Sequence, residues 1–277
     1  MLNVDMLTKK ISPYSFQICK DECVKLPRKR YCMEYFHLTQ EQFFEYSGAA
    51  ATLLEQVNEY HPSTIYQLFS GLQAVISGKK LIFSDHGRHF ESVEMFSDPM
   101  QNPRIRTLLD VVPDDEKTII FCRYESEISQ LCSLLPNAVR FDGTVPLKER
   151  DHNLQLFRDE KMYLIANKAC AGYSLNLQFC HNIIYMSNDW ELGKRLQSED
   201  RVHRLGQDHV VNITDICAEG TLDERIIDCL CRKENLLNRI ISELDNSVNC
   251  KDALARVIYG TRHQHDVFDC SELEDNL

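Results

Sequence analysis

Short apolar segments alternate with longer amphipathic ones between residues 105 and 216, and this alternation limits the possible folds more than any other feature. Apolar, β-rich runs predict strands at residues 118–122, 138–141, 162–166, 182–186 and 210–216. Helical periodicity predicts helices at residues 105–112, 128–135, 146–157 and 192–203. Strands separated by helices form βαβ units, whose parallel sheet is covered by helices on both faces. The sequence therefore predicts an α/β fold with a mostly parallel sheet.

Residues 1–97 lack this alternation and predict a separate region. Amphipathic periodicity favours helices at 39–60 and 63–76 and then a short strand at 80–84. Thr39 and Gln42 have the spacing of a capping box at the start of the first helix.

Three regions follow from these patterns. We expect a linker and helical protrusion over residues 1–97, an α/β unit over 98–248 and a polar tail over 249–277. Within the α/β unit, apolar residues at helical spacing predict a long final helix over 222–244. Its apolar face must pack against another part of the protein.

Composition and charge exclude several classes of protein. The 277 residues carry 31 Lys and Arg against 42 Asp and Glu, a formal net charge of −11. Such a chain does not coat nucleic acid nonspecifically, although a local basic groove is compatible with it. No apolar run is long enough to cross a membrane, and the first residues do not resemble a secretory signal. We therefore expect a soluble, intracellular protein, cytoplasmic or, in a eukaryote, nuclear.

The 12 cysteines predict reduced thiols, because nothing in the sequence indicates secretion. Cys19, Cys23, Cys32 and His37 are close enough in sequence to suggest a zinc site, but their spacing matches no common zinc finger. Buried thiols are the favoured alternative, and we expect no metal site on this chain.

The sequence contains no phosphate-binding loop. The nearest candidate runs from Gly71 to Lys80, but it has six residues between its glycines where the phosphate loop has four. It also has Lys80 where that loop has Ser or Thr, and it follows a helical pattern instead of a strand. We therefore expect that the chain cannot hold and hydrolyse a nucleotide by itself.

The densest polar chemistry lies between Gln197 and Gln207. On the predicted helix, Gln197, Arg201 and Arg204 fall in one row. Planar guanidinium groups in such a row suit a phosphate or carboxylate better than an apolar core. A solvated face paired with nearby carboxylates is the alternative, but it leaves the His-Arg-Leu-Gly-Gln sequence after the helix unexplained.

This segment resembles the last helicase motif, Q-x-x-x-R-x-H-R-x-G-Q, of the SWI/SNF-like ATP-driven DNA translocases in helicase superfamily two. Other segments resemble further motifs of this family, in the family's order. They are Lys117 to Arg123, Phe141 to Arg158, Ala171 to Gln178, Asp189-Trp190 and Gly220 to Arg225, together with the linker-like segments 26–29 and 38–42. Together the matches extend over residues 24–244.

The resemblance implies the second RecA-like lobe of such a motor, with a C-terminal brace helix. In this family ATP lies between two lobes, and the first lobe carries the phosphate loop and the acidic motif. The resemblance therefore implies that ATP and Mg²⁺ are bound mainly by an N-terminal lobe, which is a separate chain or a missing part. On this chain it implies Arg201 and Arg204 as catalytic arginine fingers, and Gln197, Arg201, Arg204 and Gln207 as ATP-binding residues.

The resemblance also implies an edge that binds the backbone of double-stranded DNA. The expected contacts come from Gly143, Thr144, Lys148, Arg150, Gly172, Ser174 and Asn176. Thr144 is a candidate N-cap for the following helix, whose N-terminus would favour a phosphate. For each of these residues alone, ordinary turn chemistry is at least as good an explanation. Trp190 is expected to be a packing anchor rather than a surface for base stacking.

Two functions fit these features. The favoured one is the C-terminal lobe of a DNA-stimulated ATPase and double-stranded DNA translocase, active only when a first lobe completes it. The alternative is a non-catalytic module that binds DNA or another helicase and regulates it. The retained arginines favour the first function, because a pure binding module has no need of them. An RNA helicase lobe is disfavoured by the His-Arg-Leu-Gly-Gln ending and the long final helix.

Overall fold

The protein is described by a computed structural model that covers residues 4–15, 24–56, 62–84, 89–167, 175–233, 236, 239–240 and 250–259. Within these residues the main sheet has six strands in the order β1-β8-β7-β4-β6-β5. They are β1 (Lys29–Phe36), β4 (Thr118–Cys122), β5 (Ala138–Phe141), β6 (Tyr163–Asn167), β7 (Asn182–Tyr185) and β8 (Val211–Ala218). All neighbouring pairs in this sheet are parallel, which confirms the predicted fold class.

The central strand β4 shows why the sheet is buried on both faces. Its residues alternate between two apolar cores, with Ile120 and Cys122 in one and Ile119 and Phe121 in the other. Helices α5 (Pro103–Val111), α6 (Glu125–Leu134) and α9 (Leu222–Cys231) contribute to the first core, and α7 (Leu147–Asp159) contributes to the second. The continuous apolar run of β4 is therefore the pattern of a strand covered on both sides.

The strand β1 lies in the region for which the sequence analysis predicted linker and helices. Among the described strands it is at one end of the sheet, and it pairs with β8 from Lys29 opposite Val211 to Phe36 opposite Ala218. Most of its residues are exposed or half-buried, because it has a strand neighbour on one side only. It therefore lacks the apolar pattern of a central strand, and sequence periodicity does not reveal it.

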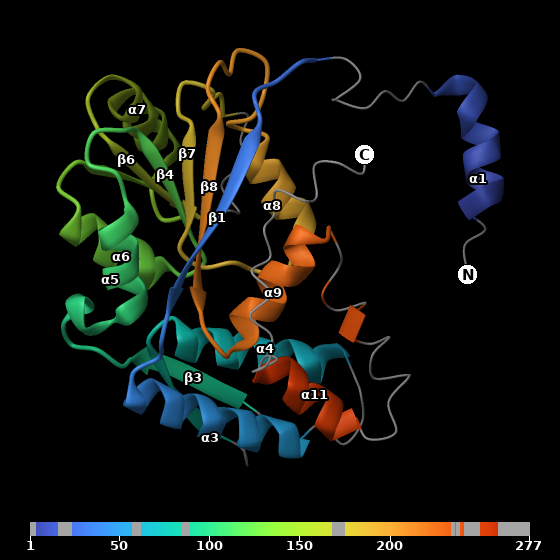
Figure 1. Cartoon of the computed structure of the whole chain (residues 1–277), viewed down its shortest axis with the longest axis vertical. Helices are drawn as coiled ribbons and strands as arrows, with labels where there is room; N and C mark the ends of the chain where they lie inside the picture. The colour runs from blue at the N-terminus through green and yellow to red at the C-terminus, as the bar shows by residue number, and fades with distance from the viewer. Residues whose placement is uncertain are drawn as a thin grey trace.

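A helical subdomain follows β1. Helices α3 (Gln40–Gln56) and α4 (Pro62–Ile76) pack together beyond the carboxyl end of β1, next to the hairpin of β2 (Lys79–Ser84) and β3 (His89–Glu94) (Figure 1). The predicted capping box is confirmed, since the Gln42 amide donates to Thr39 Oγ1 and the Thr39 amide donates to Gln42 Oε1, both at 3.1 Å. The helix α1 (Val4–Ile11) precedes these elements in the chain.

The C-terminal part differs from the sequence prediction in two ways. The helix α9 ends at Cys231 and does not continue to residue 244, because Lys233 adopts a φ of +56° that interrupts a right-handed helix. Residues assigned to the polar tail include a further helix, α11 (Cys250–Ile258). It packs against α3 and α9 (Figure 1). Tyr46 of α3 donates a hydrogen bond to the carbonyl of Ile258 at 2.7 Å. None of the described helices combines the length and apolar character of a membrane span.

A buried ion pair joins α5 to α9. Arg104 is 1% exposed and donates to a carboxylate oxygen of Asp223 and, at 2.7 Å, to the carbonyl of Met186 after β7. Burial raises the pKa of Asp223, although Arg104 acts in the opposite direction. Either charge would be costly without its partner, since neither group reaches water.

We expect Arg104→Met to lower the free energy of unfolding by about 3–5 kcal/mol, because it leaves the Asp223 carboxylate buried without its partner. The double variant R104M/D223L should lose less than the sum of the two single losses. Urea unfolding followed by circular dichroism measures all three variants. A loss below about 1 kcal/mol for R104M would contradict this account of the pair.

Candidate functional site

The predicted arginines lie in a loop after helix α8 (Leu192–Glu199), which we call the arginine loop (residues 200–207). The carbonyl of Glu199 accepts hydrogen bonds from the amides of Val202 at 3.1 Å and His203 at 2.8 Å. The chain therefore turns sharply at the end of α8, and the predicted helix does not reach residue 203. The expected helical row of polar side chains is broken after Gln197.

Two hydrogen bonds hold the arginine loop at the amino ends of the strands. The carbonyl of Arg201 accepts from the amide of Leu177 at 3.1 Å. The Nε2 atom of His203 lies 2.8 Å from the carbonyl of Pro27, just before β1. Since a carbonyl can only accept, His203 Nε2 carries the proton and donates.

Gln207, which the sequence analysis expected to bind ATP, closes the loop from inside the fold. Its side chain is 4% exposed and donates from Nε2 to the carbonyl of Cys180 at 2.9 Å. Its Oε1 accepts from the amide of His209 at 3.0 Å. Gly206 next to it has a φ of +94°, a conformation that favours glycine and lets the chain turn inward. Gln207 therefore supports the shape of the loop.

The other three predicted ATP contacts are more accessible. Gln197 is exposed, and Arg201 and Arg204 are half-buried. Arg204 Nη1 donates to Oδ1 of the exposed Asn176 at 2.5 Å. Because an amide oxygen carries no formal charge, this bond directs the Arg204 guanidinium without neutralising it.

A third arginine, Arg195, has a different environment, which the sequence analysis missed. It is 4% exposed, its guanidinium carbon lies 3.5 Å from the ring centre of Tyr185, and it forms ion pairs with Asp215 at 2.6 Å and Glu199 at 2.7 Å. Although burial acts in the opposite direction, the two carboxylates raise the pKa of Arg195. Arg195 thus attaches α8 to β8. In the sequence, only the spacing of four residues between Arg195 and Glu199 indicated an ion pair of Arg195.

The Glu199 carboxylate is shared between α8 and β1. One oxygen accepts from Arg195, and the other accepts from Lys29 at 2.8 Å and Tyr31 at 2.9 Å. Glu199 is 2% exposed, so the three donors replace the water that a carboxylate requires. Burial and the neighbouring Glu199 charge raise the pKa of Tyr31, which keeps its hydroxyl protonated as a donor.

The first predicted DNA contacts lie in the loop between β5 and α7, which we call the β5–α7 loop (residues 142–146). Gly143 and Thr144 are exposed, and a side chain at Gly143 would meet no atom within 4 Å. Thr144 is not the N-cap of α7, a position that Pro146 occupies. Instead the Thr144 amide and hydroxyl donate to Asp142 at 2.9 and 2.6 Å, which shapes the turn.

The two positive residues predicted beside this loop differ in position. Lys148 is exposed in the first turn of α7. Arg150 is 8% exposed and donates to the carbonyls of Val145 at 2.7 Å and Gly143 at 3.1 Å. Arg150 therefore braces the β5–α7 loop from within, and Lys148 presents the charge to solvent.

The predicted residues form two groups at opposite ends of the parallel strands. The arginine loop contacts the segments that precede β1 and β7, whereas the β5–α7 loop follows the carboxyl end of β5. Asn176, predicted as a DNA contact, lies in the first group because it bonds Arg204. Gly172 and Ser174 lie outside the described residues.

Trp190 packs, as the sequence analysis expects, but against the helical subdomain. Its ring meets Tyr66 and Phe69 of α4 edge-on, with centroids 5.1 and 6.1 Å apart. The Arg123 guanidinium carbon lies 4.6 Å from the Trp190 ring centre. Trp190 therefore links the start of α8 to α4 through aromatic and cation–π contacts.

The rejected phosphate-loop candidate has an ordinary structural explanation, and the zinc candidate lies only partly within the described residues. Gly71 lies inside α4, and Lys80 lies in β2, so this segment does not join a strand to a helix. Cys32 is exposed in β1, and His37 lies 3.2 Å from Glu219. Cys19 and Cys23 lie outside the described residues. In the part of the chain that is described, no group of three or more His, Cys, Asp or Glu side chains could hold a metal ion.

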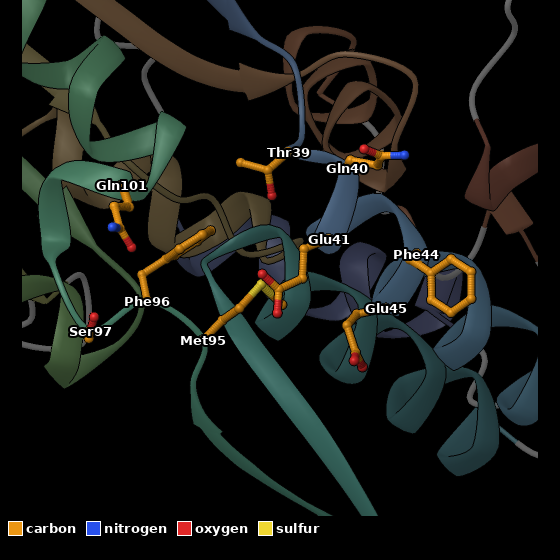
Figure 2. Close-up of a pocket in the computed structure, with 9 residues that line it drawn as sticks. All are labelled: Thr39, Gln40, Glu41, Phe44, Glu45, Met95, Phe96, Ser97 and Gln101. Carbon is orange, nitrogen blue, oxygen red and sulfur yellow. The ribbon is translucent and has the colours of Figure 1, made fainter.

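A surface pocket lies away from both predicted groups. The side chains that line it come from the start of α3 and from residues 95–101 (Figure 2). Glu41, Phe44 and Met95 are among them, and Glu45 pairs with Lys80 at 2.8 Å. No residue of the arginine loop or the β5–α7 loop contributes to it, so it is not the candidate site.

Comparison with known proteins gives the family. Residues 103–206, from the start of α5 into the arginine loop, match the helicase conserved C-terminal domain. The C-terminal part of the Fun30 ATPase domain superposes with a TM-score of 0.58 at 19% identity, covering 74% of this chain and 89% of that one. Residues 103–206 of this chain form a helicase C-terminal domain, and the fold is that of SWI2/SNF2 ATPase C-terminal domains. The resemblance drawn from the sequence is therefore confirmed.

Two further proteins are similar to this chain. The Sulfolobus solfataricus SWI2/SNF2 ATPase core in complex with double-stranded DNA has a TM-score of 0.61 at 22% identity, covering 93% of this chain and 56% of that one. An uncharacterized ATP-dependent helicase of Bacillus subtilis, YqhH, is 29% identical over 192 residues, which is 67% of this chain and 33% of that protein. The chain thus spans a third or less of the length of the curated relatives it matches.

The ionised state of Glu199 in the helicase C-terminal domain gives a prediction about pH. Burial alone would raise the pKa of Glu199, but Arg195 and Lys29 together lower this pKa below its ordinary value. A carboxyl group of this kind adds stability above its unfolded pKa of about 4.3, and this contribution is lost as the pH falls through the folded pKa. Glu199→Gln should therefore destabilise the protein most near neutral pH. Its deficit in free energy of unfolding should shrink as the pH falls below the unfolded pKa of about 4.3.

Urea titrations at a series of pH values measure this deficit. Glu149→Gln is the matched control, since Glu149 is exposed in α7, and its effect should stay near zero at every pH. A deficit for E199Q that does not change with pH would contradict the proposed ionisation.

Proposed function

We propose that this chain is the C-terminal lobe of a DNA-stimulated ATPase that moves along double-stranded DNA, and that an N-terminal lobe with a phosphate loop completes it. The supporting observation is the contrast among three arginines near one helix end. Arg195 is committed inside the fold, whereas Arg201 and Arg204 are partly accessible in a loop whose backbone is fixed.

The donor set of the arginine loop fits the phosphates of ATP. Guanidinium groups are planar, permanently charged and suited to paired hydrogen bonds with phosphate oxygens. Gln197 is exposed in the last turn of α8 and would add an amide donor. We propose that Mg²⁺ and most of the ATP are held by the N-terminal lobe, whose phosphate loop this sequence lacks.

In this mechanism ATP would bind at the boundary between the two lobes, where its terminal phosphoanhydride bond is hydrolysed. Arg201 and Arg204 would stabilise the negative charge that develops on the transferred phosphoryl group, an effect worth about 10³–10⁵ in rate for arginine fingers. Asn176 would orient Arg204, and Gln207 would keep the loop closed behind it. Closing and opening of the two lobes would then move the DNA-binding groups relative to each other.

We assign the β5–α7 loop to the DNA backbone. Gly143 and Thr144 are exposed, Lys148 adds charge, and Arg150 braces the loop. Gly172 and Ser174 are proposed as further contacts. Asn176, predicted as another, lies at the other end of the sheet and is assigned to Arg204 instead. Groups of this kind bind phosphate and sugar, so no sequence specificity is expected. The likeness to a SWI2/SNF2 core in complex with double-stranded DNA supports this choice of substrate. With such a substrate, we propose an intracellular location, cytoplasmic or nuclear.

The 277-residue chain alone should not hydrolyse ATP above background, even with duplex DNA. Combined with an N-terminal lobe that has a phosphate loop, it should show hydrolysis stimulated by DNA. In that pair Arg204→Ala should lower kcat by about 10³-fold or more, because charge stabilisation in the transition state is lost. Arg204→Lys should rescue little, since lysine lacks the planar fork. Phosphate release under steady-state conditions measures these rates.

Arg106→Ala is the control for this experiment, since Arg106 is exposed on α5, and it should retain nearly full activity. Circular dichroism confirms that each variant is folded. Turnover by the chain alone would reveal a nucleotide site within it. Normal hydrolysis by the Arg204→Ala pair would refute the finger assignment. No hydrolysis by the unaltered pair would favour the non-catalytic binding module.

Lys148→Ala should weaken binding to duplex DNA equally for unrelated sequences, because Lys148 is proposed to contact phosphate only. The slope of log affinity against log salt concentration should fall by about 1. Fluorescence anisotropy with two labelled duplexes at several salt concentrations measures both effects. Lys161→Ala is the control, since Lys161 lies before β6 at the opposite end of the sheet. An equal loss in both variants would count against the β5–α7 loop as the DNA contact.

A further inference from the structure

We propose that the segment 27–31 positions the arginine loop through Pro27, Lys29 and Tyr31, so that displacing these three residues displaces Arg201 and Arg204. The inference rests on the proposed function, which gives these arginines their role. The segment lies far before the matched helicase domain in sequence, yet it contacts the loop and its base at two separate points.

The first contact fixes the base of the loop. Lys29 and Tyr31 lie two residues apart on β1, so they present their side chains on the same face of the strand. Both donate to the same carboxylate oxygen of Glu199, at 2.8 and 2.9 Å. The Glu199 carbonyl accepts the amides of Val202 and His203. The position of Glu199 therefore determines where the loop begins.

The second contact fixes the middle of the loop. His203 is 9% exposed, and its Nε2 donates to the carbonyl of Pro27 at 2.8 Å. His203 directly precedes Arg204 in the chain. A movement of Pro27 would therefore shift the His203 side chain and, with it, the adjacent backbone of Arg204.

These contacts can change without unfolding the lobe. Arg195 pairs with both Asp215 and Glu199, so α8 stays attached to β8 when β1 gives up its donors. The Lys29 side chain is 20% exposed, which places this ion pair at the margin of the core. The contacts from β1 therefore restrain the position of a helix end that is already attached to β8.

Hydrogen exchange in the full chain tests the inference without reference to ATP. The double variant K29M/Y31F should raise the exchange rates of the Val202 and His203 amides about tenfold, because Glu199 loses two donors and its backbone is less restrained. Lys29→Arg keeps the charge and should retain near-native protection. Mass spectrometry of peptides that span residues 199–204 measures these rates.

The matched control is R30M/Y35F, which makes the same kind of change on β1. Arg30 is exposed, and Tyr35 lies farther along the strand, where its hydroxyl contacts Met33. This control should leave exchange in the arginine loop within about twofold of the native rate. Native rates in K29M/Y31F would overturn the proposal. So would an equal increase in β4 and β7, which would indicate general destabilisation.

A second measurement connects position to catalysis. In the two-lobe pair, K29M/Y31F should lower kcat and leave KM for ATP within about twofold, since the arginines would act mainly in the transition state. Native kcat despite tenfold faster exchange would overturn the link to catalysis. Failure of the proposed function itself is seen separately, as full activity of the Arg204→Ala pair.

Discussion

The carboxylate of Glu199 is buried, and the structure around the candidate site depends on how that charge is neutralised. Arg195 comes from the same helix, whereas Lys29 and Tyr31 come from β1 at the other end of the sequence. Because an unpaired charge inside a protein is costly, the end of α8 is most stable where these elements meet. The arginine loop starts at this junction, so its position follows from the burial of one acidic side chain.

The parallel sheet separates the two proposed activities. All six described strands of the main sheet run in the same direction, so their amino ends lie on one side and their carboxyl ends on the other. The arginine loop lies at the first side and the β5–α7 loop at the second. A lobe built in this way can face a nucleotide and a DNA backbone with different edges, and a rigid sheet connects the two. The Arg204–Asn176 bond ties the arginine loop to the segment that follows β6.

The central strands and their helices could be predicted from the sequence because burial on both faces leaves a continuous apolar run, as in Thr118–Cys122. The capping box at Thr39 could also be predicted, since capping depends on neighbours in the chain. The strand β1 could not, because an exposed strand at the end of a sheet has no apolar alternation. The burial of Arg195 and Gln207 could not be predicted either, since each has a partner that only the folded chain brings within reach.

The sequence by itself determined the fold class and the family, because periodicity and motif order are properties of the linear chain. Only the tertiary structure decided which arginines are held inside and which remain accessible. The physical reason is that a buried guanidinium or carboxylate requires a partner, and the partners here are up to 170 residues apart. Local sequence can place Arg195, Arg201 and Arg204 near one helix end, but the positions of β8 and β1 determine that Arg195 is the one committed to the core.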